Sequence, residues 1–341
     1  MVEVAGMAPE LSQRILDLLS SNPSGIPQSH IHRALGVSKA YVSIILKDME
    51  RRGVIYRDKV GNSYIVKLAT KPSQIGRKLK LGMVWSSEYL FLGHFAKALR
   101  NVLGLDLAIT VYPSALQATS AIIRGEIDAV LSPLVTQLYA YISTKSIVIV
   151  GGGAGGGAMI YEFPRSRSNI LISSEASSMD LCRVAALKKG AIEQEDVRYF
   201  ATPSEAIETI RRGKARYAVL WHPLTEYVKS IDHSKVVECS EFEELKYCCT
   251  LATSGNMDIE TVKKISIVYR DSIEEFLKQP LRYLDWYSSI TGIDTTLLKK
   301  ALNVYTYTPE IDARSVWRVI ETLNLNVPQK SSVIKAILSH F

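Results

Sequence analysis

Hydroxyl-bearing and aromatic residues follow several short apolar runs of this 341-residue chain. Serine hydroxyls and free backbone N–H groups at helix starts can bind anions, because the first four donors of a helix have no intrahelical partner. Tryptophan rings can enclose a flat or apolar molecule. We therefore predict a small-molecule site between two groups of such residues. The first group is Trp85, Ser86, Ser87 and Ser132, and the second is Ser173, Ser174, Ser177, Trp221 and His222.

Each of these residues could instead have an ordinary structural role. Serines in such turns commonly cap helices, and tryptophans commonly contribute to a core. Under this alternative the nine residues share no ligand, and their side chains do not converge on a common cavity. The sequence leaves both interpretations open for any single residue.

A glycine-rich run at residues 151–157 matches the pattern G-x-G-x-x-G of dinucleotide-binding sites. That site requires a helix after the glycines, because the helix N-terminus binds the pyrophosphate. Residues 158–161, Ala-Met-Ile-Tyr, instead favour a strand, and no Gly-Lys-Ser/Thr follows. We expect no cofactor here. The glycines are better explained by close backbone approach to a ligand or by hinge flexibility.

The four cysteines, Cys182, Cys239, Cys248 and Cys249, have no Cys-x-x-Cys spacing. This argues against a zinc ribbon or a disulfide framework and favours reduced, buried thiols. Adjacent residues of a strand point to opposite faces, so Cys248 and Cys249 are not expected to share a metal ion. No Ser/His/Asp set is evident either, so the sequence assigns no metal ligand and no catalytic residue.

Two segments with the same order of residue types would position the predicted site. Residues 124–134 contain Arg-Gly, then Ala-Val-Leu, then Pro-Leu, and residues 212–224 repeat this order with two extra residues. Each segment predicts a helix that ends at glycine, a short strand, and a proline that opens the next helix. Ligands of open α/β sheets bind at the carboxyl ends of strands, where Ser132, Trp221 and His222 stand. Chance recurrence of helix–Gly–strand units is the alternative.

Alternating apolar runs and helical patterns predict two similar α/β lobes after residue 78. A strand–helix–strand–helix–strand order predicts a parallel sheet in each lobe. The predicted strands are 79–85, 107–111, 129–131 and 146–150 in the first lobe, and 169–172, 197–200 and 217–220 in the second. The predicted helices are 89–103, 114–123, 179–189 and 204–212.

The first eighty residues differ from the rest in charge. They hold 13 Lys and Arg against 6 Asp and Glu, whereas residues 81–341 hold 28 of each sign. A basic small domain joined to a neutral large one suggests that the small domain meets a polyanion. No run of eighteen apolar residues and no secretory signal is present, so we expect a cytoplasmic protein without a membrane span.

Helical periodicity over residues 11–19, a second helix from residue 27 and a third over 39–52 precede a predicted hairpin at 54–67. Gly-Val-Ser-Lys-Ala-Tyr-Val-Ser at 36–43 and Leu-Lys-Asp-Met-Glu-Arg-Arg-Gly-Val-Ile at 46–55 resemble MarR/ArsR-like winged helix-turn-helix domains. The resemblance implies that the third helix enters the major groove of double-stranded DNA. Protein docking is the alternative role for such a module. The predicted DNA-binding residues are Ser38, Lys39, Ala40, Ser43, Ile44, Lys47, Arg51, Arg57 and Lys59.

Residues 79 to about 290 resemble type 2 periplasmic binding proteins of the nitrate, sulfonate and thiamine-precursor branch. The motifs are Gly-Glu-Ile-Asp-Ala at 125–129, Tyr-Ala-Val-Leu-Trp-His-Pro at 217–223 and Leu-Ala-Thr-Ser at 251–254. The resemblance implies two hinged lobes with the ligand between them. It places the crossing strands near 158–162 and 246–251, and C-terminal helices from 259 onward.

Together these features predict an α/β protein with an N-terminal winged helix-turn-helix and a two-lobed periplasmic-binding-protein-like clamshell with C-terminal helices. The expected divisions are 1–68 for the DNA-binding domain, 69–78 for the linker and 79–341 for the clamshell. Lobe one would span about 79–160 plus the return after about 246, and lobe two about 165–245.

The expected function is a cytoplasmic, ligand-responsive transcription regulator. Its effector would be an anion, sulfonate, amino acid or pyrimidine precursor, and a homodimer or higher even oligomer would match paired DNA half-sites. One alternative is an enzyme on the same fold, similar to pyrimidine-precursor synthases or chorismate dehydratase, with Glu88, Glu175 or His222 as acid or base. Another is a DNA-binding protein whose clamshell is only a dimerisation scaffold.

Overall fold

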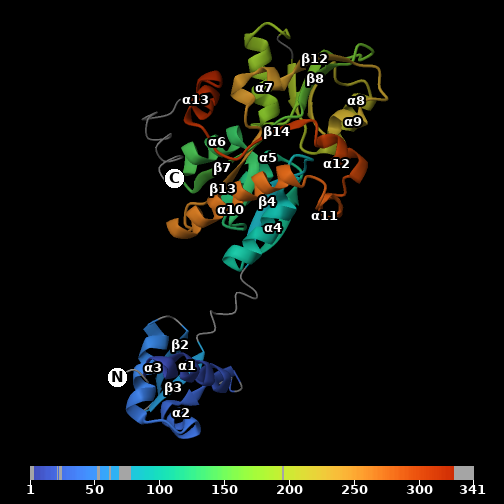
Figure 1. Ribbon diagram of the computed structural model, residues 1–341. Helices are drawn as coiled ribbons and strands as arrows, with labels where there is room; N and C mark the ends of the chain where they lie inside the picture. Colours follow the sequence, from blue (N-terminus) through green and yellow to red (C-terminus); the bar gives the residue numbers. More distant parts are fainter. Residues whose placement is uncertain are drawn as a thin grey trace. The chain divides into compact units, whose positions relative to one another are not determined.

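The chain forms two compact units, Met1–Gly76 and Arg77–Phe341. The computed structural model describes residues 4–20, 22, 25–51, 54–60, 63–68, 78–193 and 196–325 (Figure 1). Residues 69–77 of the predicted linker lie outside this range. None of the described helices is long and apolar enough to cross a membrane.

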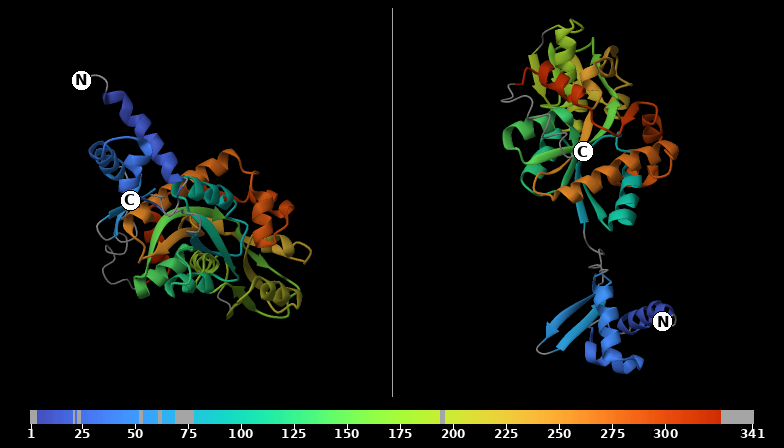
Figure 2. Two further views of the ribbon diagram at one scale, coloured as in Figure 1. Left: turned by 90° about the horizontal axis from the view of Figure 1, so that it is seen from below. Right: turned by 60° about the vertical axis from the view of Figure 1, so that its left-hand side comes forward.

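The described residues of the smaller unit form a bundle of three helices on a three-stranded antiparallel sheet. Strand β3 lies between β1 and β2, and Figure 2 shows β2 and β3 as a hairpin. The apolar stripe predicted on the third helix is buried against the other helices and the sheet, with Leu46 and Met49 fully buried. The predicted turn at 61–62 lies outside the described residues. The elements are α1 (Val4–Ser20), β1 (Ile26–Pro27), α2 (Gln28–Leu35), α3 (Lys39–Arg51), β2 (Ile55–Val60) and β3 (Ser63–Leu68).

The larger unit has two lobes, each built on its own sheet. Lobe one has a six-stranded sheet in the order β14-β7-β13-β6-β4-β5, and α10 packs beside α4 against it (Figures 1 and 2). The predicted parallel pairing is confirmed for β4, β5 and β6. Strand β13 lies between β6 and β7 and pairs antiparallel with both, and β14 pairs antiparallel with β7. Its elements before the first crossing are β4 (Lys78–Val84), α4 (Leu92–Ala98), η1 (Leu99–Leu103), β5 (Asp106–Tyr112), α5 (Ala115–Ile123), β6 (Ala129–Pro133), α6 (Leu134–Thr144) and β7 (Ile147–Gly156).

Lobe two has a five-stranded sheet in the order β10-β9-β11-β8-β12. Strands β9, β10 and β11 are parallel as predicted, and β8 pairs antiparallel with both β11 and β12. The elements are β8 (Ala158–Glu162), β9 (Ile170–Ser173), α7 (Ser178–Lys188), β10 (Asp196–Tyr199), α8 (Pro203–Arg211), β11 (Tyr217–Trp221), α9 (Leu224–Tyr227), β12 (Ser234–Glu238), η2 (Cys239–Glu241) and η3 (Glu243–Leu245).

The chain then returns to lobe one, and its C-terminal part contains a strand that the sequence did not predict. Helices follow the return strand as expected, but β14 adds to the edge of the lobe one sheet beside β7. The elements are β13 (Cys249–Ser254), α10 (Ile259–Lys278), α11 (Leu284–Thr291), α12 (Thr295–Ala301), β14 (Tyr305–Thr308) and α13 (Ala313–Thr322).

The two crossings between the lobes lie close to the predicted positions. The first falls at Gly157, between β7 of one sheet and β8 of the other, so residues 158–162 already belong to lobe two. The boundary near 165 predicted for lobe two was therefore too late. The second crossing runs from η3 to β13, within the predicted region 246–251.

The repeated Arg-Gly segments form the same local structure in both lobes. Helices α5 and α8 each have an arginine as the C-cap residue, and Gly125 and Gly213 follow with φ of 72° and 63°. Only glycine adopts this left-handed conformation without cost, which explains its place after both helices. At the other end, Ser114 and Thr202 each cap their helix through a side-chain oxygen. The predicted helix–Gly–strand unit is confirmed in both lobes.

The glycines of β7 serve strand packing and not the approach of a ligand. A Cβ atom on Gly152 would lie 2.1 Å from the Thr308 carbonyl oxygen, and one on Gly153 would lie 2.0 Å from the Cys249 carbonyl oxygen. On Gly151 it would meet the Tyr269 ring at 2.7 Å. The run therefore lets β13, β14 and α10 approach β7 more closely than any side chain would allow.

A disulfide joins Cys182 of α7 to Cys239 of η2, across 57 residues of lobe two. The expectation that all four cysteines are reduced was wrong for this pair. Spacing in sequence gave no sign of the bond, because the fold brings the two Cα atoms to 5.6 Å. Cys248 and Cys249 are free and buried, as expected.

We predict that breaking this disulfide destabilises the larger unit. Closing a loop of this length restricts the unfolded chain, and the chain-entropy model gives about 4 kcal/mol. Cys182→Ala with Cys239→Ala should lower the denaturation midpoint measured without reductant, and dithiothreitol should do the same to the wild type. If the wild-type midpoint is insensitive to reductant and peptide mapping finds both thiols free, the bond does not form.

Candidate functional site

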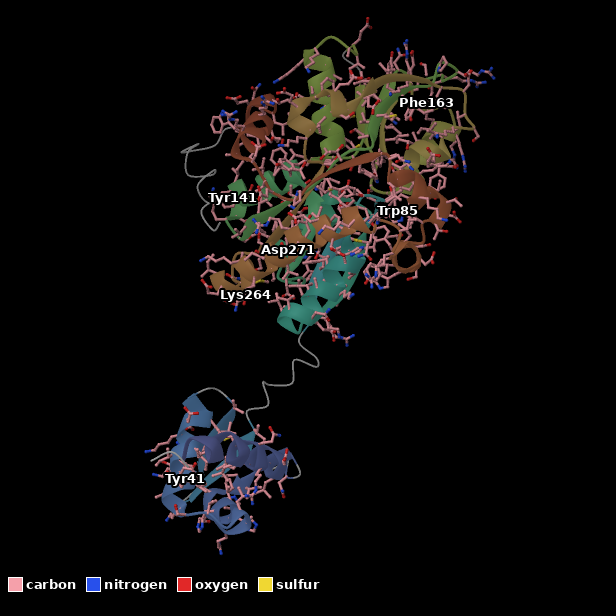
Figure 3. All side chains as sticks on the ribbon, in the orientation of Figure 1. Tyr41, Trp85, Tyr141, Phe163, Lys264 and Asp271 are labelled. Carbon is pink, nitrogen blue, oxygen red and sulfur yellow. A yellow bond between two sulfur atoms is a disulfide. The ribbon has the colours of Figure 1, made fainter. Side chains whose placement is uncertain are left out.

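The two lobes meet face to face through hydrogen bonds contributed by residues that follow strands. The Trp221 Nε1 donates to the Trp85 carbonyl at 3.1 Å, and the Thr136 hydroxyl of α6 donates to the Ala176 carbonyl at 2.6 Å. The Ser178 hydroxyl at the start of α7 donates to the Cys248 carbonyl at 2.8 Å. Figure 3 shows Trp85 at the boundary between the lobes. The clamshell is therefore closed in this structure.

Ser87 and His222 form a further contact between the lobes. The Ser87 Oγ lies 2.5 Å from His222 Nδ1 and donates to the His222 carbonyl at 3.0 Å. The Tyr305 hydroxyl donates to the same carbonyl at 3.0 Å. The Ser87 and His222 side chains are both buried, and His222 Nε2 has no hydrogen-bond partner among the described residues. Burial lowers the pKa of His222 to about 4, so the ring is neutral near pH 7.

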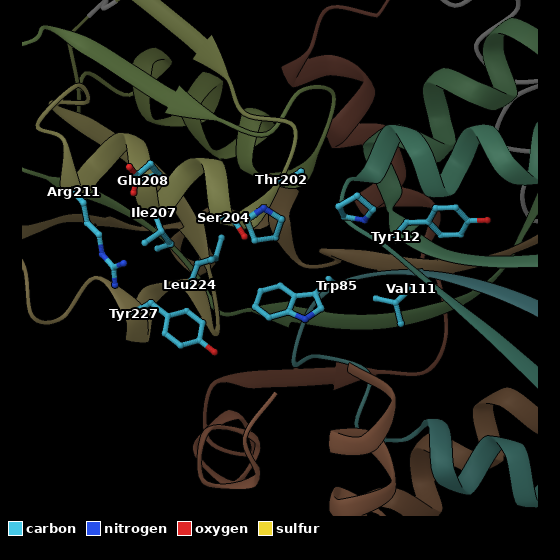
Figure 4. A pocket seen from close by; sticks show the side chains of 12 residues that line it. Trp85, Val111, Tyr112, Thr202, Ser204, Ile207, Glu208, Arg211, Leu224 and Tyr227 are labelled. Atoms are coloured by element: carbon cyan, nitrogen blue, oxygen red, sulfur yellow. The ribbon is translucent and has the colours of Figure 1, made fainter. Parts of the chain in front are cut away.

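A groove of about 920 Å³ lies on one side of this interface, and we call it the outer groove. Its volume suits a small organic ligand. Lobe one contributes residues around the ends of β4 and β5, and lobe two contributes α8 and α9 (Figure 4). The lining residues are Trp85, Val111, Tyr112, Pro113, Thr202, Pro203, Ser204, Ile207, Glu208, Arg211, Leu224 and Tyr227.

Arg211 contributes a positive charge to the lining of the outer groove. It is exposed at the end of α8, and it makes no ion pair within the described part of the chain. The neighbouring carboxylate, Glu208, is paired with Arg212 at 2.6 Å. Trp85 lies in the middle of the groove with Leu224 and Tyr227 near it (Figure 4). The groove thus combines aromatic surface with a guanidinium available to an anionic group.

A second, much smaller cavity of about 30 Å³ lies at the floor of the interface, and we call it the inner cavity. This volume corresponds to about one water molecule. No lysine or arginine lines it. The lining residues are Val84, Ser86, Glu88, Tyr89, Ala115, Pro133, Ser174, Ser177, Ser178, Met179, Trp221, Cys248 and Cys249.

Acidic and thiol groups gather in the inner cavity. Glu88 is buried, and its Oε1 has no hydrogen-bond partner among the described residues. Burial raises the pKa of the Glu88 carboxyl above its ordinary value, and it raises that of the Cys249 thiol well above its own. The Cys248 and Cys249 sulfurs lie 3.9 Å apart. The expectation that adjacent cysteines face away from each other was wrong, because β13 begins only at Cys249 and strand alternation does not apply to Cys248.

The structure brings some of the predicted ligand residues together and separates others. Four of them line the inner cavity, one lines the outer groove, and four line neither. The four in the inner cavity are Ser86, Ser174, Ser177 and Trp221, the one in the outer groove is Trp85, and the remaining four are Ser87, Ser132, Ser173 and His222.

Several of these residues have the structural roles that were the alternative. Ser177 caps α7 by accepting from the Met179 N–H at 3.1 Å. Ser132 is fully buried in lobe one, where it accepts from the Thr119 hydroxyl at 2.9 Å. Trp221 stacks on Phe200, with ring centroids 6.0 Å apart. The two tryptophans line different cavities, so they do not enclose one ligand between them.

Most residues of the outer groove were not predicted from the sequence. Thr202 and Ser204 at the start of α8 carry the same N-terminal signal as the predicted serines and could have been found by it. Arg211 and Tyr227 carry none, because an exposed arginine or tyrosine on a helix is common in any protein. The sequence suggested Glu88 only as a possible acid or base, and neither Glu175 nor His222 lines the inner cavity with it.

The predicted DNA-binding residues lie mainly on one face of α3 in the smaller unit. Lys39, Ala40 and Lys47 are exposed, and Ile44 is 64% exposed despite its apolar side chain. Ser38 is exposed and caps the helix by accepting from the Tyr41 N–H at 3.2 Å.

The other predicted DNA-binding residues differ in their exposure to solvent. Ser43 is half-buried, Lys59 on β2 is exposed, and the side chain of Arg51 lies outside the described residues. Arg57 is held within the unit, because its guanidinium pairs with Glu50 and lies over the Tyr64 ring at 5.4 Å from the centroid. The ion pair lowers the pKa of Glu50.

Comparisons with solved structures identify the fold of the larger unit. The ligand-binding component of an ABC-type import system from Staphylococcus aureus, solved with zinc bound, has a TM-score of 0.61 at 14% identity and covers 75% of this chain and 95% of its own. The alkanesulfonate-binding protein of Xanthomonas axonopodis pv. citri, bound to MOPS, gives 0.61 at 14%, covering 74% and 94%. The larger unit has the periplasmic-binding-protein fold.

A third solved structure agrees with this fold, and the smaller unit has a separate match. The periplasmic aliphatic sulphonate binding protein of Escherichia coli gives a TM-score of 0.59 at 13% identity and covers 73% of this chain and 86% of its own. Residues 9–69 match a family described as a domain of unknown function (DUF7343). A comparison with curated protein sequences found no match.

We predict that acid weakens the larger unit through His222. Its pKa is about 4 when folded against an ordinary 6.5, so the unfolded chain binds the proton more readily. The stability is fully present above about pH 6.5 and falls as the pH is lowered toward 4, by up to about 3 kcal/mol. Denaturation curves at several pH values should show this slope, and His222→Gln should reduce it. Equal slopes for the two proteins would exclude His222 as the cause.

Proposed function

We propose that this protein is a ligand-responsive transcription regulator, in which the two-lobed unit binds a small molecule and the N-terminal unit binds DNA. The observation that carries the proposal is the outer groove, which both lobes line. It contains aromatic side chains and the Arg211 guanidinium, which has no ion pair within the described part of the chain. A ligand held by both lobes stabilises the closed form relative to the open one. It can therefore shift a conformational equilibrium by its difference in affinity for the two forms.

The ligand that fits the outer groove best is a small organic anion with an apolar body. Arg211 would pair with the anionic group, and Trp85, Ile207 and Leu224 would contact the apolar part. Two of the similar structures are named as sulfonate-binding proteins, one with MOPS bound, which supports a sulfonate as the first probe. A small organic anion is a narrower class of ligand than the one expected from the sequence, which was an anion, sulfonate, amino acid or pyrimidine precursor.

The DNA-binding part of the proposal rests on the smaller unit. Its order of helix, strand, two helices and hairpin is that of winged helix-turn-helix domains, and residues 1–76 hold 10 Lys and Arg against 6 Asp and Glu. The exposed face of α3 presents Lys39 and Lys47 beside small and apolar side chains. Such a face can enter a major groove, contact phosphates through the lysines and contact bases through the short side chains.

We further propose that the protein is a cytoplasmic homodimer without catalytic activity. Contact with DNA requires an intracellular location, and two-fold symmetry matches paired half-sites. A cytoplasmic location requires that the Cys182–Cys239 disulfide persists inside the cell. Intracellular disulfides are common in hyperthermophiles, whereas they are rare in the cytosol of other organisms. Of the possible acid–base residues, Glu88 lines the inner cavity and neither Glu175 nor His222 lines it or the outer groove, which favours binding over catalysis.

We predict that Arg211→Ala weakens binding of a short alkanesulfonate by about 10- to 100-fold, because a hydrogen bond to a charged group contributes about 1.5–3 kcal/mol. Titration calorimetry measures the affinity, and the thermal unfolding of the variant should match the wild type because Arg211 is exposed. Arg198→Ala, an exposed arginine of β10 outside the groove, is the matched control. Equal losses for both variants would reject the assignment of Arg211.

We predict that Lys39→Ala with Lys47→Ala weakens binding to random-sequence duplex DNA and makes it less dependent on salt. Each lost phosphate contact should reduce the slope of log affinity against log salt concentration by about 0.9. The double variant Lys263→Ala with Lys264→Ala removes two exposed lysines of α10 and should leave the slope unchanged. An unchanged slope in the Lys39 and Lys47 variant would place any DNA contact elsewhere.

The coupling itself is tested by measuring DNA affinity with and without saturating sulfonate. Genomic fragments retained by the wild-type protein supply the specific site. A regulator should change its affinity for this site several-fold when the ligand binds, and Arg211→Ala should require correspondingly more ligand. If the ligand leaves the DNA affinity unchanged, the two units bind their partners independently and the protein is not a ligand-responsive regulator.

A further inference from the structure

Three potential metal ligands converge in the inner cavity, apart from the outer groove. The Glu88 carboxylate and the sulfurs of Cys248 and Cys249 place one ligand atom each within 4.8 Å of one another, and all three residues are buried. Glu88 Oε1 is also without a hydrogen-bond partner among the described residues. A buried polar atom without a partner is costly, so its persistence at this point needs an explanation.

The spacing of the two sulfurs matches a small four-coordinate ion. Two sulfurs bound at about 2.3 Å to a tetrahedral zinc ion are separated by about 3.8 Å. The two cysteine sulfurs lie 3.9 Å apart, so they need little movement to bind one ion. The inner cavity, about 30 Å³, has room for a single ion but not for an organic ligand.

The chemistry of the donors selects the class of metal. Thiolates favour thiophilic ions such as zinc, whereas magnesium and calcium require oxygen ligands only. Two sulfurs and one carboxylate oxygen form a mixed set that zinc accepts readily. The cavity lining contains no lysine or arginine that could balance buried negative charge, and a divalent cation would do so.

The three residues also lie where an ion can enter and be covered. Glu88 follows β4, and the two cysteines stand at the second crossing, so all three belong to the lobe one side of the interface. Ser174, Ser177 and Met179 of lobe two line the opposite side of the cavity. An open clamshell would expose the three ligands, and closure would bring lobe two over the fourth coordination position.

We propose that Glu88, Cys248 and Cys249 bind one zinc-class ion at the floor of the interface between the lobes. The ion has three protein ligands and a fourth position that faces lobe two. This site is separate from the outer groove and depends neither on DNA binding nor on the binding of an organic anion.

The test is metal binding by the full-length protein in anaerobic buffer without thiol reductant, which preserves the Cys182–Cys239 disulfide. After incubation with zinc chloride and gel filtration, elemental analysis should find one zinc per chain. Cys248→Ser with Cys249→Ser should lose this ion, and Glu88→Gln should bind it more weakly by more than about 100-fold, because even an outer-shell partner contributes about 10- to 100-fold. Glu175→Gln, which changes an exposed carboxyl outside the cavity, should keep it.

A cobalt titration of the wild type makes the test independent of the variants' folding. Cobalt chloride should give the intense near-ultraviolet band of thiolate-to-cobalt charge transfer, and zinc should abolish it by displacement. Absence of zinc in the wild type, equal zinc content in the double-cysteine variant, or cobalt binding without the thiolate band would each overturn the proposal. The sulfonate and DNA measurements are unaffected by any of these outcomes, so the two proposals can fail separately.

Discussion

The close approach of three strands at the glycine-rich part of β7 is the constraint on which the rest of the larger unit depends. No Cβ atom fits at Gly152, Gly153 or Gly155, because each would lie within about 2 Å of a carbonyl oxygen of a neighbouring segment. This approach brings the first crossing, the return strand β13 and the C-terminal strand β14 together in one place. It fixes where the chain passes between the lobes, and therefore where the lobes meet.

The positions of both cavities follow from that arrangement. The return segment pairs with β7 through the Cys248 N–H, which donates to the Ala154 carbonyl at 2.7 Å. The register of β13 on β7 shifts twice within Thr250–Ala252, so the segment is not a regular strand at this point. Cys248 stands before the first residue of β13, so strand alternation does not hold its sulfur on the face opposite that of Cys249, and both sulfurs lie near Glu88. The outer groove lies farther along the same interface, where α8 and α9 face the ends of β4 and β5.

The lobes carry two different kinds of polar group toward their interface. Buried serine and histidine side chains hold the closed form through hydrogen bonds between the lobes, as Ser87 and His222 do. The outer groove instead offers Arg211, which is available to solvent and to a ligand. This division explains why residues of one predicted set have such different roles. A hydroxyl near a helix start can cap the helix, join the lobes or contact a ligand, and its neighbours decide which.

The sequence by itself determined the order of most elements, the repeated helix–Gly–strand unit, the two lobes and the basic N-terminal segment. These depend on local periodicity, on capping residues and on glycines with positive φ, all of which act over a few residues. Only the tertiary structure decided which side chains line a cavity, that Cys182 pairs with Cys239, and that Cys248 and Cys249 face Glu88. Those facts depend on contacts between residues far apart in the chain and on irregular backbone, and no local pattern encodes either.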